Sequence, residues 1–196
     1  MRLNLRSRGG LNFSRRRHRI DRKTVKKIIS WLVEIVIVLA VAYALVYSLG
    51  MRVTVAESSM VPTLENGDRV LVNRVIYHVQ SPKAGDIVAF YPNGNEKSRY
   101  YIKRIIGEPG DTIQIQDGVV YVNGDALESA NRESIENAGL AEEPVTVGED
   151  EYFVLGDNRN NSEDSRYASI GNVKKEDIAG KVWFQTYPRN SMGRVE

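Results

Sequence analysis

The hydrophobic positions of this chain follow two different patterns on either side of residue 50. Residues 28–49 form a continuous, mainly apolar run in which Glu34 is the one charged side chain. A helix needs about 20 apolar residues to cross the hydrocarbon core of a bilayer, so this run has the length of one membrane span. From residue 51 onward, apolar and polar residues alternate in short stretches, which is typical of half-buried β-strands. The pattern predicts a transmembrane helix over residues 28–50 and a mostly β domain over residues 51–196.

Turn-forming dipeptides divide the second part into short segments. Asp117-Gly118 and Asn123-Gly124 bracket one apolar stretch, as tight hairpin turns do, and therefore predict an antiparallel sheet. Residues 127–143 are compatible with a short helix or a surface insertion, and residues 188–196 with a loose C-terminal tail. The predicted strands are Arg52–Ala56, Arg69–Asn73, Asp86–Tyr91, Tyr100–Ile106, Thr112–Gln116, Val119–Val122, Glu151–Leu155 and Lys181–Gln185.

Positive charge is concentrated before the apolar run. Residues 1–27 contain 11 Lys/Arg and one acid, whereas residues 50–196 contain 16 Lys/Arg and 23 Asp/Glu. The acidic character of the second part argues against nucleic acid as its partner. Because Lys and Arg are enriched on the cytoplasmic side of membrane helices, we expect residues 1–27 to be a basic cytoplasmic tail. The domain at 51–196 would then lie outside the cell membrane, behind a single span.

Two other interpretations of the apolar run are weaker. A cleaved signal peptide would have a small-x-small site after a shorter apolar core, and Ala42-Tyr43-Ala44 has that spacing but lies inside the run. A buried core helix would show an amphipathic face, and none is visible. Glu34 is interpreted as a carboxylate that reaches toward the cytoplasmic interface, with a role in helix pairing as the alternative.

The residue types available for catalysis are few. The chain has no cysteine and two histidines, His18 in the basic tail and His78, neither with an evident catalytic partner. This composition argues against thiolate chemistry, a His-based metal site and a Ser-His-Asp hydrolase. A serine nucleophile with a lysine base is the simplest remaining arrangement, and Ser59 and Lys103 are the candidates.

A lysine acts as a base only when its amine is uncharged. The reference pKa near 10.4 must fall by roughly 3 units for that at neutral pH, and burial among apolar groups has this effect. Lys103 is flanked by Ile102 and lies close to Ile105. Strand alternation would place Lys103 and Ile105 on one face and Arg104 on the other. The sequence is compatible with a buried lysine, although a lone lysine in a strand is more often solvated.

Four motifs occur in a fixed order between residues 59 and 166. They are Ser59-Met60-x-Pro-Thr, Gly85-Asp86-Ile87-Val88, Lys103-Arg104-Ile105-x-Gly107-x-Pro109-Gly110-Asp111, and Gly156-Asp157-Asn158-Arg159-Asn160-Asn161-Ser162-Glu163-Asp164-Ser165-Arg166. Behind a membrane anchor, this set closely resembles the type I signal peptidases, the membrane-bound serine–lysine proteases that remove signal peptides from exported proteins. The short outer domain and single anchor resemble the Gram-positive form.

The resemblance assigns roles to individual residues. Ser59 matches the nucleophile and Lys103 the general base, while Ser162 matches the serine that orients the lysine amine. Asp164 and Arg166 match a structural ion pair. The backbone N–H of Ser59 would be one oxyanion donor. The substrate would lie extended between residues 53–57 and 100–103, beside pockets that admit small side chains, and the substrate-binding residues implied are Ala56, Met60, Leu64, Tyr101 and Ile102.

The resemblance also implies what the protein works with. Neither a metal nor an organic cofactor is expected. The expected partners are preproteins that emerge from the export channel and the phospholipid membrane. One departure concerns Glu57, because family members have serine or glycine two residues before the nucleophile. A carboxylate aimed at a developing oxyanion would oppose catalysis, so we predict that Glu57 faces solvent, and no second oxyanion donor is assigned.

Two rival functions share some of these features. The self-cleaving repressors use the same serine–lysine chemistry, but they are cytosolic and carry a DNA-binding domain that this sequence does not show. A non-catalytic membrane-anchored adaptor, or a degenerate paralogue, would keep the anchor without the chemistry. The presence of Ser59, Lys103 and Ser162 together argues against degeneracy.

Overall fold

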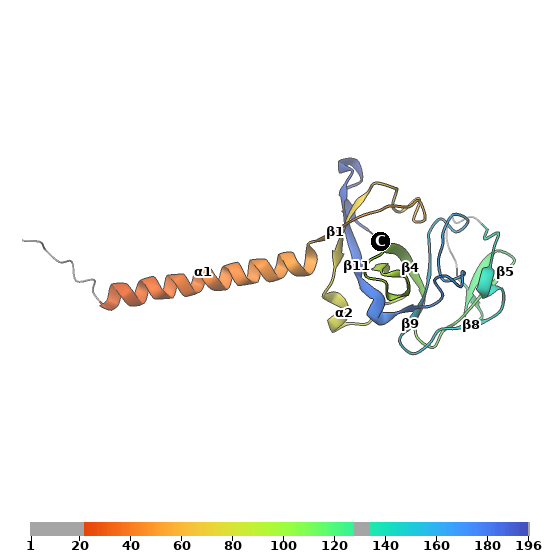
Figure 1. Ribbon diagram of the computed structural model, residues 1–196, viewed down its shortest axis with the longest axis horizontal. Coiled ribbons are helices and arrows are strands. Elements are labelled where there is room, and N and C mark those ends of the chain that lie inside the picture. The colour runs from red at the N-terminus through yellow and green to blue at the C-terminus, as the bar shows by residue number, and fades with distance from the viewer. Residues whose placement is uncertain (1–21, 128–133, 196) are drawn as a thin grey trace, which may run out of the picture. The chain divides into compact units, whose positions relative to one another are not determined.

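The computed structural model describes residues 22–127 and 134–195 (Figure 1). The chain divides into two compact units, Met1–Ala42 and Tyr43–Glu196. Most of the predicted basic tail, residues 1–21, lies outside the described part of the chain.

The N-terminal unit is built on a long helix. Helix α1 (Arg22–Leu49) has 28 residues and is about 42 Å long at 1.5 Å per residue. Its segment Arg22–Tyr47 is long and apolar enough to span a membrane, and its large apolar side chains are exposed rather than packed in a core. The predicted span began at Ile28, and the described helix also includes the basic residues before it, from Arg22 onward. The helix exceeds the roughly 30 Å hydrocarbon core, which leaves length for its basic first turns outside the core.

The larger sheet of the C-terminal unit is antiparallel and has the strand order β1-β2-β11-β3-β4-β9-β10, with β12 paired to β11. In Figure 1, the long strand β11 and the strands β4 and β9 belong to this sheet. Its strands are β1 (Met51–Thr54), β2 (Arg69–Asn73), β3 (Ile87–Phe90), β4 (Tyr101–Gly107), β9 (Glu151–Leu155), β10 (Val173–Lys174), β11 (Ile178–Tyr187) and β12 (Gly193–Arg194).

The smaller sheet has the order β7-β6-β5-β8, and its strands are β5 (Thr112–Gln116), β6 (Val119–Val122), β7 (Asp125–Ala126) and β8 (Val145–Thr146). The two predicted hairpin turns are confirmed. Asp117 and Gly118 have φ of 50° and 77°, and Asn123 and Gly124 have φ of 54° and 88°. Positive φ at both central residues is the geometry that Asn-Gly and Asp-Gly favour in two-residue hairpins.

Short helical turns connect the strands. They are α2 (Ile76–Val79) and the 3₁₀ turns η1 (Pro92–Gly94), η2 (Gly139–Glu142), η3 (Lys175–Asp177) and η4 (Arg189–Ser191). Within the described part of residues 127–143, the helical segment is the single turn η2. The prediction of a loose tail at 188–196 is wrong. Its residues form η4 and β12, and Val195 donates its N–H to the carbonyl of Trp183 and packs on the core.

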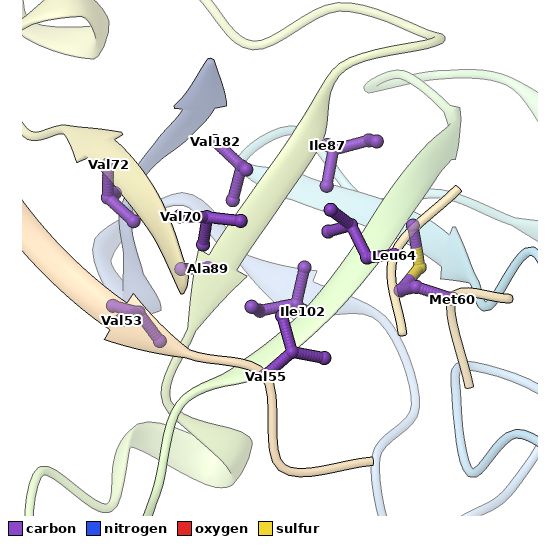
Figure 2. Close-up of a cluster of buried hydrophobic side chains, with 10 residues drawn as sticks. All are labelled: Val53, Val55, Met60, Leu64, Val70, Val72, Ile87, Ala89, Ile102 and Val182. Carbon is purple, nitrogen blue, oxygen red and sulfur yellow. The ribbon is translucent and has the colours of Figure 1, made fainter. Parts of the chain in front are cut away.

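Three clusters of buried side chains hold the β domain together. The first joins β1, β2, β3, β4 and β11 with Met60 and Leu64 from the loop after β1 (Figure 2). The second lies between the smaller sheet and β9, and the third packs on Val88, Phe90 and Ile105. Strand β4 contributes to all three, with Ile102, Ile106 and Ile105 respectively. Each such side chain contributes roughly 1.5–3 kcal/mol when fully buried, so β4 is fixed on both faces.

Candidate active site

Ser59 and Lys103 lie next to each other although 44 positions separate them in the chain. Lys103 is in the middle of β4, opposite Val88 of β3, and its side chain is 0% exposed. Its Nζ is 2.7 Å from the Oγ of Ser59, and Ser59 itself is buried. A hydroxyl and an amine at this distance form a hydrogen bond along which a proton can move.

Two anchors fix the position of Ser59. On its C-terminal side, Met60 and Leu64 are fully buried in the cluster of Figure 2, and Leu64 N–H donates to the carbonyl of Met60 at 2.9 Å. On the loop after β9, the N–H of Asn158 donates to the carbonyl of Ser59 at 2.9 Å. Ser59 therefore has little freedom to move away from Lys103.

The surroundings of Lys103 act on its protonation in two directions. Burial lowers the pKa of the Lys103 amine, because the charged form loses its hydration. The carboxylates of Glu57, Asp164 and Glu163 raise the pKa again, and Glu57 acts most strongly. The net direction is downward, so the uncharged amine is present at lower pH than for a solvated lysine.

Glu57 is exposed, as predicted, with 47% of its side chain accessible. No sequence pattern, however, indicated that its carboxylate also reaches the lysine. The Oε2 of Glu57 is 3.4 Å from the Nζ of Lys103.

Ser162 lies in the same region, but the structure does not pair it with Lys103. Its Oγ is buried and has no hydrogen-bond partner among the described residues. A Cβ placed on Gly156 would meet the Oγ of Ser162 at 2.2 Å and the carbonyl oxygen of Ser59 at 2.5 Å. Glycine at position 156 thus allows the loop that carries Ser162 to approach Ser59 closely. The role of Ser162 in orienting the lysine stays a prediction.

Asp164 and Arg166 form a buried ion pair, as the resemblance implied. The Nε and Nη2 of Arg166 donate to the two carboxylate oxygens of Asp164 at 2.8 and 2.9 Å. The same guanidinium also donates to the carbonyls of Asn137 and Arg159, and the N–H of Gly156 donates to Asp164 at 3.1 Å. A two-point arginine–carboxylate pair has a fixed geometry, so it holds the loop around Ser162 in one shape.

A second ion pair at the site was not predicted. The Nε and Nη2 of Arg104 donate to the carboxylate of Asp157 at 2.9 and 2.8 Å, and Thr63 Oγ1 donates to the same carboxylate at 2.6 Å. Alternation along the strand did indicate that Arg104 points away from Lys103. The partner was not evident, because 53 positions separate Arg104 from Asp157.

The expected substrate-binding residues take different positions. Met60, Leu64 and Ile102 are in the buried core, Tyr101 is half-buried, and Ala56 is exposed. Ala56 lines a pocket of about 590 Å³. The remaining lining residues are Glu57, Ser58, Ser59, Asn66, Asn160, Asn161, Ser162, Glu163 and Tyr167.

Two stretches of backbone beside this site have no strand partner on one side within the described residues. Strand β1 pairs only with β2 and is an edge of the sheet. Strand β4 pairs with β3 from Tyr101 onward but with β9 only from Arg104 onward. The backbone of residues 101–103 is therefore open on the side that faces away from β3.

Over residues 22–127 and 134–195, no group of three or more His, Asp or Glu side chains is placed to hold a metal ion.

Comparison with known proteins gives the family. The family model described as signal peptidase, peptidase S26, matches residues 28–187. The chain therefore belongs to the S26 family of signal peptidases. It is 36% identical over 186 residues to a protein named signal peptidase I from Bacillus licheniformis, which covers 90% of this chain and 98% of that protein. It is also 37% identical over 186 residues to signal peptidase I T from Bacillus subtilis strain 168, covering 89% of this chain and 95% of that protein.

Two further relatives are similar over a shorter stretch. A protein named probable signal peptidase I-2 from Synechocystis is 40% identical over 162 residues, covering 76% of this chain and 72% of that protein. The crystal structure of a signal peptidase I from Enterococcus faecalis matches with a TM-score of 0.40 and 34% identity, covering 53% of this chain and 97% of that one.

Proposed function

We propose that this protein is a membrane-bound endopeptidase that removes N-terminal signal peptides from exported preproteins, with Ser59 as nucleophile and Lys103 as general base. The observation that carries the proposal is the 2.7 Å contact between Ser59 Oγ and the buried amine of Lys103, in a chain of the signal peptidase family. The relatives' name, signal peptidase I, supports signal peptides as the substrate class.

The reaction follows from the geometry of this pair. Uncharged Lys103 takes the proton of Ser59 as its Oγ attacks the scissile carbonyl carbon, and the backbone N–H of Ser59 stabilises the oxyanion. The C–N bond breaks, the lysine proton passes to the leaving amine, and an ester joins the signal peptide to Ser59. Lys103 then takes a proton from the water that attacks the ester carbon. The bond between that carbon and Ser59 Oγ breaks, the proton returns from Lys103 to Ser59, and the signal peptide leaves with a free carboxyl group.

The open backbone edges suggest how the substrate binds. An extended peptide would add as a strand between residues 53–57 and 101–103, with main-chain hydrogen bonds for affinity and pockets for alternate side chains. Cleavage after a small-x-small motif agrees with this arrangement. Met60, Leu64 and Ile102 are buried in the core, so the preference for small side chains rests on the family resemblance.

The basic N-terminal segment supports an orientation. We infer a cytoplasmic tail at 1–27, a span at 28–50 that continues the helix from Arg22, and a peptidase domain at 51–196 outside the cell membrane. In this orientation the site would face preproteins leaving the export channel, next to the lipid surface. The chain contains no cysteine, so single cysteines at Ser7 and at exposed Ser191 can be probed in intact cells with a membrane-impermeant thiol reagent. Labelling of the Ser7 variant, and not the Ser191 variant, would refute this orientation.

The non-catalytic adaptor is the less favoured alternative. It offers no reason for a lysine to be buried against a serine hydroxyl, since burying an amine is costly. The chain belongs to the signal peptidase family, so a self-cleaving repressor is also the less favoured alternative.

The test uses the full-length protein in detergent with a preprotein that carries a small-x-small site. We expect the wild type to cleave at that site, Ser59→Ala and Lys103→Ala to lose cleavage, and Lys97→Ala, which alters an exposed lysine, to cleave normally. Cleavage that persists in Ser59→Ala would refute the assigned nucleophile. Absence of cleavage by the wild type would favour the adaptor.

A further inference from the structure

The side chains of Glu57, Lys103 and Ser59 form a series of contacts at the site that the family resemblance does not imply. The Oε2 of Glu57 is 3.4 Å from the Nζ of Lys103, and that Nζ is 2.7 Å from the Oγ of Ser59. A carboxylate, a base and a nucleophile in sequence repeat the logic of an acid–base–nucleophile triad, with lysine in the middle place. Glu57 and Ser59 belong to the same short segment, so the carboxylate is held near the lysine by the backbone that carries the nucleophile.

We propose that Glu57 is a positioning residue that holds the Lys103 amine toward Ser59, stabilises the ammonium formed when Lys103 takes the serine proton, and thereby sets the pH range of cleavage. This inference rests on the proposed serine–lysine mechanism. In that mechanism a positive charge develops on a side chain with 0% exposure, where few groups other than a nearby carboxylate can compensate it.

The other charged and titratable groups around Lys103 are placed differently. Asp164, on the loop after β9, has both carboxylate oxygens bound by Arg166. Glu163, on the same loop, accepts hydrogen bonds from Ser169 at 2.7 Å and from Tyr101 at 3.5 Å. The ring of Tyr101 lies 5.2 Å from Nζ, and strand β3 presents the apolar Val88 opposite the lysine. Glu57 is thus the carboxylate that makes direct contact with the amine.

The contact has two effects that oppose each other at neutral pH. It favours the charged amine, which raises the pKa of Lys103 against the larger lowering by burial, and so reduces the fraction of free base. It also stabilises the transition state in which the amine gains the proton. The acid limb of the pH–rate profile is the range in which the rate rises as Lys103 loses its proton, and removing the negative charge should therefore move this limb to lower pH. It should also lower the plateau that the rate reaches at alkaline pH. Because the Glu57 side chain is 47% exposed, solvent screens the pair and both effects should be moderate.

The experiment compares kcat/KM from pH 5 to 10 for the full-length protein in detergent, using a peptide with an Ala-x-Ala site and no titratable side chains near it. For Glu57→Gln we expect the acid limb to shift down by about 0.3–1 unit and the plateau to fall about two- to fivefold. Glu57→Asp, which keeps the charge, should restore part of both. Glu163→Gln is the matched control, a carboxylate of the same pocket without a lysine contact, and should shift the limb less.

Each outcome has a defined meaning. An unmoved acid limb in Glu57→Gln, a higher plateau, or an equal shift in Glu163→Gln would overturn the inference. If the wild type cleaves, Ser59→Ala does not, and the limb of Glu57→Gln is unmoved, only this inference fails. If the wild type does not cleave, the proposed function itself fails. Unfolding temperatures of the variants serve to exclude loss of the fold as the cause of a lower plateau.

Discussion

Arg104 and Asp157 form a two-point ion pair that joins the strand carrying Lys103 to the loop that follows β9. The guanidinium donates at 2.9 and 2.8 Å, the Asp157 side chain is 1% exposed, and Thr63 donates to the same carboxylate. Thr63 is in the loop that carries Ser59, so one carboxylate ties together the three chain segments that make the site. The pair therefore acts on the placement of both the nucleophile and the base.

Replacing Asp157 should therefore affect both stability and cleavage. Asp157→Asn removes the negative charge that binds the Arg104 guanidinium in a largely buried position, which costs roughly 3 kcal/mol of unfolding free energy. The midpoint of thermal unfolding should fall clearly, and kcat should drop because Ser59 and Lys103 are less well aligned. The control is Asp150→Asn at an exposed position. Equal midpoints for the two variants would contradict this account of the ion pair.

Glycine at position 156 should be essential for activity. In Gly156→Ala the new Cβ would lie 2.2 Å from Ser162 Oγ and 2.5 Å from the carbonyl oxygen of Ser59, so the loop must move away from the nucleophile. We expect cleavage to fall at least about tenfold, as misplacement of reacting groups by about 1 Å costs even more in other enzymes. Gly193→Ala, where no atom lies within 4 Å of the added Cβ, should keep wild-type activity. A fully active Gly156→Ala variant would contradict the packing.

Burial of Lys103 should make the protein less stable as pH falls. The pKa of Lys103 is lowered in the folded state, so the unfolded chain binds more protons between the folded and unfolded pKa values. Stability from this group is present above its unfolded pKa and is lost as pH falls toward the folded pKa.

Lys103→Met should remove this penalty while abolishing cleavage. Its unfolding temperature should exceed that of the wild type, by a margin that grows between pH 10 and pH 6. The exposed-site variant Lys97→Met should show no such trend. A margin that shrinks toward acid pH would mean that Lys103 is stabilised in its charged form.

Arg166 should not be replaceable by lysine. Its guanidinium binds both oxygens of Asp164 and the carbonyls of Asn137 and Arg159 at once, and a lysine ammonium lacks the planar fork that makes these bonds together. Arg166→Lys should lower the unfolding temperature by several degrees and reduce cleavage, because the loop around Ser162 loses its support. Arg99→Lys, at an exposed site, should do neither. Unchanged stability in Arg166→Lys would show that the fork is dispensable.

The sequence predicted the main elements well where local patterns decide them. All eight predicted strands exist, and four have the predicted bounds, because alternation and turn dipeptides act within a few residues. Strand β11 extends over Ile178–Tyr187, beyond the predicted Lys181–Gln185, because it pairs with β3 at one end and β2 at the other, with register shifts on the way. The short strand β12 was missed for a similar reason, since its pairing with Phe184 and Gln185 is tertiary.

The sequence predicted which residues form the site better than it predicted which of them contact one another. The motifs identified Ser59, Lys103, Asp164 and Arg166. In the structure Ser59 does contact Lys103, and Asp164 does pair with Arg166. The contact of Glu57 with Lys103 was not predicted, because alternation describes the face on which a side chain lies and not the reach of a flexible carboxylate. The neighbours of Lys103 on β4, Ile102, Ile105 and Ile106, pack in three different clusters, and no local pattern in the sequence contains these tertiary contacts.

The proposed mechanism requires that Ser59 forms an ester with the signal peptide while Lys103 accepts the serine proton and passes it to the leaving amine. It is tested most directly by acid-quenching the full-length protein during turnover of a preprotein substrate and measuring its mass, followed by peptide mapping. We expect a mass increase equal to that of the cleaved signal peptide less one water, located at Ser59 and absent from Ser59→Ala and Lys103→Ala. Cleavage that proceeds with the covalent adduct on another residue would contradict it.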